Sequence, residues 1–453
     1  MIDAEQAPAE QPSFFGSVNV VMVTYAIDGA LALATSVLIA REVGPEGRGA
    51  YGLFVLTAAF GAMLLGLGIG NAAIYYLNKG ELALREALGA VHTVTLVATA
   101  ITAIVVVIVA PLTGGAFLDD EITPWLLIAA VPAILYLQLL RLLLQGLNRF
   151  VDLGVVTIGQ QLAILALVAV TVISTDASPQ TFVVYLIVAS AGAALYALLR
   201  IGIRHVDVRA IIQPQISTLK KLSGFGLQGE AGNILQLLNY RLDQYLVRVF
   251  VSLGGVGIYA TAVSLTEGVF ILANAVALVL MPRLTAANDQ DAAWMAPVAT
   301  RNTLLIAAGV SIAIAAVAPF VLPWLFGDAF DDSVQALWLL LPGTVALAGS
   351  KVLTSYIFSR GKPLVNTMIT AAGLVVTLGC GLALIPWLGV NGAAIASSLA
   401  YCAHFGASLY AYGRISGGSM LDAVLPRRQD AQLYADAVRG MRKRAANPQA
   451  VGR

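Results

Sequence analysis

The stretch "NYRLDQYLV" (239–247) places an arginine and an aspartate two residues apart inside a long apolar run, Leu219–Leu253. The run is long enough to cross a membrane, because a spanning helix needs about 20 mostly apolar residues. A charge at the centre of such a helix costs roughly 2.5–3.5 kcal/mol. Residues two apart on a helix do not face each other, so Arg241 and Asp243 cannot simply neutralise one another. Each therefore needs a partner or a task of its own.

The composition of the whole chain agrees with a membrane environment. The 453 residues are 59% hydrophobic and 11% charged, whereas soluble domains average about 25% charged residues. The net charge of +1 indicates nothing about partners, and we expect no nucleic-acid partner. Cys380 and Cys402 both lie in apolar runs, which argues against a disulfide framework or a zinc site. The first fourteen residues lack a basic signal-peptide start, so we interpret the following run as an uncleaved span.

Apolar runs of spanning length recur along the chain, and the connections between them are short. We predict an all-α polytopic membrane protein with twelve transmembrane helices and no extramembrane domain between spans. The predicted spans are 15–40, 48–76, 86–112, 123–146, 152–173, 180–200, 222–250, 256–282, 298–326, 333–359, 364–386 and 391–413.

Basic residues are distributed unevenly among the connections. Those after odd-numbered spans hold only Arg41 and Arg48. Those after even-numbered spans hold Lys79, Arg85, Arg149, Arg200, Arg204, Arg209, Lys220, Lys221, Arg283, Arg301, Arg360 and Lys362. Because short basic loops stay in the cytoplasm, we predict a multi-pass protein of the inner (plasma) membrane with both termini cytoplasmic.

A faint internal repeat divides the chain into halves. Its paired segments are "EGRGAYGLF" (46–54) with "GGVGIYATA" (254–262), and "LLLQGLNRF" (142–150) with "SYIFSRGKP" (355–363). The alternative is chance recurrence in a chain with 43 glycines. The repeat predicts an N-terminal six-helix lobe (1–210), a parallel C-terminal six-helix lobe (211–415) and a basic cytoplasmic tail (416–453). Parallel repeats about an axis normal to the membrane are a transporter architecture.

The seventh predicted span carries a polar face. At about 100° of rotation per residue, one broad arc of this helix holds Glu230, Asn233, Gln236, Asn239, Arg241, Asp243 and Gln244. The narrower remainder is leucine and valine and can face lipid. A single ion pair is enough to hold two helices together, whereas the wall of a water-filled cavity needs many polar residues. The pattern therefore favours a cavity wall.

Further charges lie at depth in other spans. Asp28, Glu267 and Lys351 are within spans, and Arg141 is near the inner end of its span, where it could snorkel to the interface. Five charges lie deepest: Asp28, Arg241, Asp243, Glu267 and Lys351. Exposed to lipid, they would cost about 15 kcal/mol together. They must face water or one another, and an ion pair such as Lys351 with Glu267 is the structural alternative. The lone carboxylates Asp28 and Glu267 are our candidates for binding a coupling cation, H+ or Na+.

Several kinds of site are missing from the sequence. It has no P-loop glycine pattern, no His-Glu-x-x-His, no Gly-x-Ser-x-Gly and no cysteine–metal spacing. We therefore expect no catalytic residues, no metal, no cofactor and no enzymatic activity. The tail segment "RRQDAQLYADAVRGMRKR" (427–444) is a candidate for contact with anionic membrane lipids, or else a solvated tail.

Five segments carry a resemblance to a known family. They are "LIAREVGPEGRGAYGLF" (38–54), "GLGIGNAAIYYL" (66–77), "NYRLDQYLVRVFVSLGGVGIYATA" (239–262), "LFGDAFDDSVQALWLLLP" (325–342) and "LIPWLGVNGAAIASSLAY" (384–401). In this order they resemble bacterial polysaccharide transporters, the O-antigen type flippases of oligosaccharide-linked lipids. That superfamily also contains drug/cation antiporters and the lipid II flippase.

The resemblance implies two six-helix lobes around a central cavity, alternating access, and flipping of a polyprenyl-pyrophosphate-linked glycan to the outer leaflet. It also allows polysaccharide polymerase components as partners. Arg241 and Lys351 are then candidates for the pyrophosphate, and the amides and carboxylates beside Arg241 for sugar hydroxyls. Two rival functions are a cation-coupled multidrug exporter of the same superfamily and a membrane polymerase or ligase of lipid-linked sugars. The cations Arg241 and Lys351 argue against the exporter, and the short outer loops argue against the enzyme.

Overall fold

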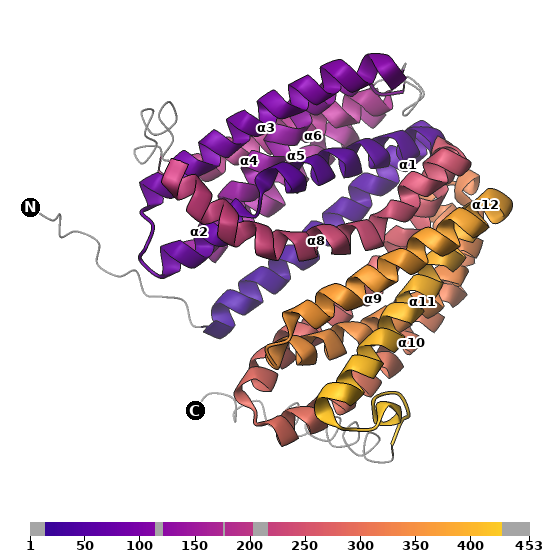
Figure 1. The fold of residues 1–453 in the computed structure, drawn as a ribbon. Helices are drawn as coiled ribbons and strands as arrows, with labels where there is room; N and C mark the ends of the chain where they lie inside the picture. The colour runs from indigo at the N-terminus through magenta and orange to yellow at the C-terminus, as the bar shows by residue number, and fades with distance from the viewer. Residues whose placement is uncertain (1–13, 114–120, 175–176, 203–215, 428–453) are drawn as a thin grey trace, which may run out of the picture. The chain divides into compact units, whose positions relative to one another are not determined.

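The structure is a computed structural model that describes residues 14–113, 121–174, 177–202 and 216–427, and within these ranges it is helical with no strand (Figure 1). The helices of its first part are α1 (Phe14–Gly66), α2 (Ile69–Asn78), α3 (Leu84–Thr113), α4 (Leu127–Gly146), α5 (Phe150–Ser174), α6 (Pro179–Ile201) and α8 (Ile216–Phe250). They are followed by α9 (Leu253–Ala286), α10 (Asp289–Phe326), α11 (Asp332–Ser359) and α12 (Pro363–Ser416). The short 3-10 segments are η1 (Pro124–Leu126), η3 (Asp328–Phe330) and η4 (Met420–Ala423).

Nine helices of the described chain are long and apolar enough to cross a membrane. Two of these, α1 and α12, run to 53 and 54 residues, well beyond the roughly 20 that one span needs. Each is broken at a glycine with positive φ, Gly44 at 65° and Gly389 at 57°. Glycine adopts this conformation without the steric cost that a side chain adds. The predicted class, an all-α multi-pass membrane protein, is confirmed.

One predicted span differs from the helix that forms there. The apolar run 48–76 is divided between the end of α1 and the short α2, because Leu67 and Gly68 both take positive φ, 50° and 66°. Hydropathy cannot reveal such a break, since the residues on both sides remain apolar. The basic residues Arg204 and Arg209 and the tail beyond residue 427 lie outside the described residues.

The chain forms two compact units. The first comprises Met1–Ala260 with Leu322–Asp332, and the second comprises Thr261–Val321 with Ser333–Arg453. Helix α8 packs on α2 and α1 and is thus part of the first unit. The predicted lobe boundary between residues 210 and 211 rests on the sequence repeat and stays a prediction.

Charged side chains join helix ends within each unit. In the first unit, Asp152 of α5 accepts ion pairs from Arg149 at 2.6 Å and from Arg200 of α6 at 2.7 Å. In the second, Arg360 pairs with Asp289 at 2.7 Å and donates to the carbonyl oxygen of Leu284 near the end of α9. These arginines therefore contribute to the packing of the helix ends as well as to the loop charge bias.

Two segments of the repeat pack against each other in the first unit. A Cβ added to Gly49 would overlap the carbonyl oxygen of Leu253, and one added to Gly257 would overlap the carbonyl oxygen of Pro45. In each segment the carbonyl residue precedes the glycine by four positions. The contact is therefore reciprocal, and glycine lets the two backbones touch as small residues do between membrane helices.

This contact predicts unequal costs for two similar substitutions. Gly49→Ala should destabilise the protein by about 1–3 kcal/mol, because its methyl group has no room beside Leu253. Gly52→Ala, one turn away, meets nothing within 4 Å and should be neutral or stabilising by up to about 1 kcal/mol. Thermal unfolding of the two purified variants in one detergent measures the difference. Equal melting temperatures would contradict the tight contact.

Candidate substrate site

A small cavity with four polar side chains in its wall lies among the helices of the first unit. Its volume is about 130 Å³, and Glu230 of α8 lies in its wall with only 6% of its surface exposed. Three amide side chains line the cavity with it: Asn71 of α2, Gln138 of α4 and Asn233 of α8. Asn233 Nδ2 donates a hydrogen bond of 3.4 Å to Glu230 Oε2. One carboxylate and three amides thus share the wall of this cavity, and the amide residues are exposed whereas Glu230 is buried.

Glycines allow the helices around this cavity to approach closely. A Cβ on Gly68 would overlap the backbone of Gly226 in α8, and one on Gly226 would overlap the backbone of Gly68. The left-handed turn at Leu67 and Gly68 ends α1 and starts α2, so that Asn71 lies in the first turn of α2. Glu230 follows Gly226 by one helical turn and thus lies at the same contact.

The lining groups suit a ligand rich in hydroxyls. A carboxylate accepts hydrogen bonds, whereas each amide both donates and accepts, so neighbouring sugar hydroxyls can be satisfied in either role. The same oxygens could also hold a monovalent cation. Among the described residues, no group of three or more His, Cys, Asp or Glu side chains is placed to hold a metal ion.

Asp243 lies away from this cavity, at the contact between α8 and α9. It is 2% exposed, and the hydroxyl of the fully buried Tyr259 donates to its Oδ2. The Gln244 backbone N–H donates to the other carboxylate oxygen at 2.8 Å. Asp243 therefore joins two helices in this structure. Its predicted contact with a sugar stays a prediction.

The other residues of the predicted polar arc are divided between two environments. Asn239 and Gln244 are buried, with 1% and 4% of their surfaces exposed. Gln236 is exposed, and its Nε2 donates to the Tyr240 hydroxyl at 3.2 Å. Arg241 is half-buried and interacts with other groups of the chain. Of the seven arc residues, the structure brings Glu230 and Asn233 together in the cavity wall.

Lys351 of the second unit has a polar partner inside its span. Its Nζ donates to Asn274 Oδ1 of α9 at 2.7 Å and lies 5.0 Å from the centre of the Phe270 ring. Glu267 is exposed on α9, two helical turns before Asn274. The partner of Lys351 is thus an amide, and the alternative pairing with Glu267 is not the contact formed.

The first unit holds Asp28, the other predicted coupling carboxylate. Asp28 is half-buried on α1 and interacts electrostatically with Arg141 of α4. Neither Asp28 nor Arg141 lines the cavity at Glu230. The candidate ion-coupling role of Asp28, like that of Glu267, remains a prediction.

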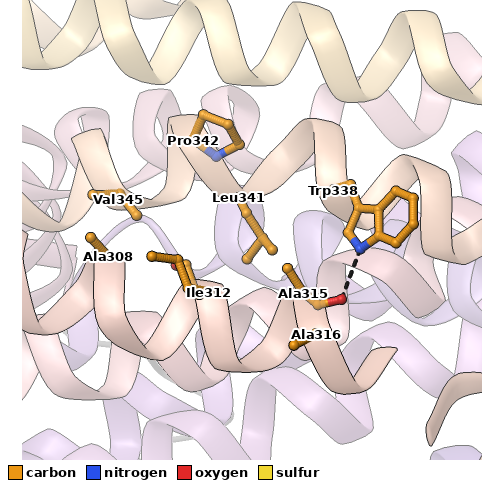
Figure 2. A pocket seen from close by; sticks show the side chains of 9 residues that line it. Ala308, Ile312, Ala315, Ala316, Trp338, Leu341, Pro342 and Val345 are labelled. Carbon is orange, nitrogen blue, oxygen red and sulfur yellow. Dashed lines mark hydrogen bonds between the residues drawn. The ribbon is translucent and has the colours of Figure 1, made fainter. Parts of the chain in front are cut away.

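A larger cavity in the second unit is a groove of about 530 Å³ between α10 and α11 (Figure 2). Ala308, Ile312, Ala315 and Ala316 form one side, and Trp338, Leu341, Pro342 and Val345 form the other. The Trp338 indole donates to the Ala315 carbonyl oxygen at 3.0 Å. The lining is mostly hydrocarbon, so this groove does not suit a sugar headgroup.

Sequence reasoning missed four of the residues that form these contacts. They are Asn71, Gln138, Tyr259 and Asn274. The available signal was an amide inside an apolar span, as at Asn71 in "GLGIGNAAIYYL" (66–77). A charged residue in a span is the stronger signal, because its cost in a membrane is higher than that of an amide.

Comparison with solved structures shows the fold. The chain shares 13% identity with the lipid II flippase MurJ in an inward closed conformation, with a TM-score of 0.70 over 89% of this chain and 91% of that one. An inward-facing multidrug resistance MATE family transporter of the MOP superfamily is 16% identical, with a TM-score of 0.69 over 88% of this chain and 98% of that one. A MOP superfamily transporter from Pyrococcus furiosus, also 16% identical, has a TM-score of 0.60 over 88% and 94%.

Comparison with sequences shows the family. None of the curated proteins compared with the chain matches it. The sequence model of the family described as "Polysaccharide biosynthesis protein" matches residues 16–288, which is more than half of the chain. With the fold of MOP superfamily transporters and the predicted resemblance both confirmed, the chain belongs to the polysaccharide biosynthesis protein family.

Proposed function

We propose that the protein is a flippase that moves polyprenyl-pyrophosphate-linked oligosaccharide from the cytoplasmic to the outer leaflet for export of a cell-surface polysaccharide. The observation that carries the proposal is the cavity whose wall holds Glu230 together with three amides from α2, α4 and α8. A membrane helix bears polar groups at depth only at a cost, so such a cluster indicates contact with a polar ligand. The family match and the transporter fold support the same function.

The roles follow from the chemistry of the substrate. Sugar hydroxyls bind Glu230, Asn233, Asn71 and Gln138 in the cavity, and Gln236, Asn239, Gln244 and Asp243 contribute along the same helix as it moves. The pyrophosphate binds Arg241 and Lys351, since charge-assisted contacts to phosphate are about twice as strong as neutral hydrogen bonds. Binding of H+ or Na+ at Asp28 or Glu267 drives alternating access. In this scheme no bond of the substrate is made or broken, so the protein is not an enzyme.

The proposal includes twelve spans in two parallel six-helix lobes, 1–210 and 211–415. Nine helices of the described residues are long and apolar enough to span. The proposal counts the two parts of α1 and of α12 as separate spans and adds the polar α8, which gives twelve. The even number leaves both termini on the cytoplasmic side of the inner membrane. A polysaccharide polymerase would receive the flipped lipid.

Reporter fusions test this topology. A reporter joined after residue 118 should read outside the cell, and one joined after residue 453 should read inside, because of the loop charge bias. Alkaline phosphatase and green fluorescent protein fusions give complementary readings at both positions. The same location for both fusions would contradict the twelve-span topology.

A cation-coupled multidrug exporter is the second candidate, and the fold shared with MATE family transporters favours it. A membrane polymerase or ligase of lipid-linked sugars has less support, because the matched structures are transporters and flippases. The decisive experiment reconstitutes the full chain in liposomes and offers a lipid-linked oligosaccharide or a cationic dye. Lectin-accessible glycan appearing in the opposite leaflet, without dye movement, supports the flippase. Dye movement without glycan movement would establish the exporter instead.

A further inference from the structure

A second polar cluster in the first unit brings together four helices. Arg141 of α4 donates from Nη2 to Gln160 Oε1 of α5 at 2.6 Å. Gln160 in turn donates from Nε2 to the hydroxyl of Ser190 in α6 at 2.7 Å. Asp28 of α1 interacts electrostatically with the same guanidinium. Arg141 is thus held toward α5, whereas its sequence position suggested that it extends to the membrane interface.

The Gln160 amide is oriented by its two partners. A guanidinium has only donors, so the Gln160 side-chain oxygen must face Arg141 and its NH₂ must face Ser190. Ser190 is fully buried, so this end of the chain of hydrogen bonds is fixed in the α5–α6 contact. Arg141 therefore has a preorganised position and conformation before any ligand arrives.

The hydrogen-bonding capacity of Arg141 is incompletely used. Among the described residues, its buried Nε has no hydrogen-bond partner. Gln160 accepts one hydrogen bond from Nη2 but is neutral, so it does not balance the charge. A buried donor left without a partner costs about 1–3 kcal/mol, and more when it is charged. Nε has almost no accessible surface of its own, but the Arg141 side chain as a whole is half-buried, and among the described residues no carboxylate lies within 4.0 Å of its guanidinium.

The nearby carboxylate decides how strongly an anion binds. Within the described chain, no ion pair of 4.0 Å or less joins Asp28 to Arg141, although the two interact electrostatically. Tyr25 of α1, which is 60% exposed, interacts with the same guanidinium. An anion at Arg141 is repelled by a charged Asp28 and is spared that repulsion once Asp28 binds a cation.

We propose that Arg141 is a binding residue for the diphosphate group of the substrate, and that Asp28 opposes this binding unless a cation neutralises it. The inference rests on the proposed function for the identity of the substrate, and it adds a diphosphate contact and a link to the coupling cation. Binding of cation and diphosphate is then mutually favourable, because linkage between two sites is reciprocal.

Direct binding to the purified full-length protein tests the proposal without glycan or transport. The probes are a prenyl diphosphate, inorganic pyrophosphate and the matching prenyl alcohol, each titrated by isothermal calorimetry. Arg141→Gln should weaken prenyl diphosphate binding by at least about tenfold and leave prenyl alcohol binding unchanged. Arg141→Lys should lose less affinity for prenyl diphosphate, since lysine keeps the positive charge but lacks the planar group that donates two parallel hydrogen bonds. Arg85→Gln, at an exposed position outside the cluster, is the matched control and should bind as the wild type does.

Asp28→Asn gives an independent result, because it leaves Arg141 in place. It should tighten prenyl diphosphate binding several-fold and abolish the effect of Na+ concentration on that affinity. Unchanged diphosphate affinity in Arg141→Gln, or weaker binding in Asp28→Asn, would overturn the proposal. If Arg141→Gln does not fold, Asp28→Asn decides alone.

Binding of prenyl diphosphate through Arg141 in a protein that moves no glycan would refute the proposed function and leave this inference standing. Equal effects on inorganic pyrophosphate would identify free diphosphate, rather than the lipid, as the ligand.

Discussion

Glu230→Gln should reduce glycan transport by about 10- to 100-fold without lowering the amount of protein in the membrane. The substitution keeps the size of the side chain but removes the charge from the cavity that Asn71, Gln138 and Asn233 also line. A hydrogen bond to a charged group contributes about 1.5–3 kcal/mol, and each 1.4 kcal/mol corresponds to a factor of ten. The measurement is the initial rate of lectin-accessible glycan in liposomes at equal protein content.

Glu81→Gln is the matched control for this substitution. Glu81 is exposed and pairs with the exposed Lys221 at 3.1 Å. Exposed ion pairs contribute only about 0–1 kcal/mol, so this variant should transport normally. Transport at the wild-type rate by Glu230→Gln would exclude the cavity from substrate binding.

Arg241→Gln should abolish transport while the protein still inserts into the membrane. Arg241 lies half-buried on the same helix as Glu230, three turns further along, and a guanidinium can bind diphosphate oxygens through two parallel hydrogen bonds. Arg241→Lys should retain part of the activity, because lysine keeps the charge but loses the planar fork. Outer-leaflet glycan measured for each variant at equal abundance gives the comparison.

Two further variants separate substrate binding from helix locking at Arg241. Arg248 lies two turns later on the same side of α8, in its last turn, so Arg248→Gln makes the same change near the helix end and should have little effect. If Arg241 were instead locked to a carboxylate of another helix, Arg241→Gln would be scarce in the membrane. A neutral double variant would then recover both abundance and transport. Full transport by an abundant Arg241→Gln protein would show that Arg241 is not needed to bind the diphosphate group.

The sequence was sufficient for the class of fold but only partly for the site. Apolar runs predict spans reliably because the membrane imposes one length and one composition on them. The helical projection of α8 placed seven polar residues on one arc, and two of them, Glu230 and Asn233, line the cavity. It could not reveal that Asp243 meets Tyr259 of α9, since a projection ignores the neighbouring helices.

The missed residues have a common physical cause. Asn71 and Gln138 come from helices distant in the sequence, and only the left-handed turn at Leu67 and Gly68 and the backbone contact at Gly226 bring them to Glu230. Arg141 could equally have extended to the interface, and its position depends on Gln160 and Ser190. Tertiary contacts of this kind leave no periodic signal in the chain.

The reciprocal contact of Gly49 with Leu253 and of Gly257 with Pro45 also has a local symmetry. In the repeat, Gly49 corresponds to Gly257 and Pro45 corresponds to Leu253. Each glycine therefore touches the residue that corresponds to the proline or leucine of its own segment, as in the interface of a twofold-symmetric dimer. The contact therefore has the geometry of a self-complementary interface, although both of its surfaces belong to one chain. Both sides of it need glycine, so a larger side chain at either Gly49 or Gly257 would separate the two backbones.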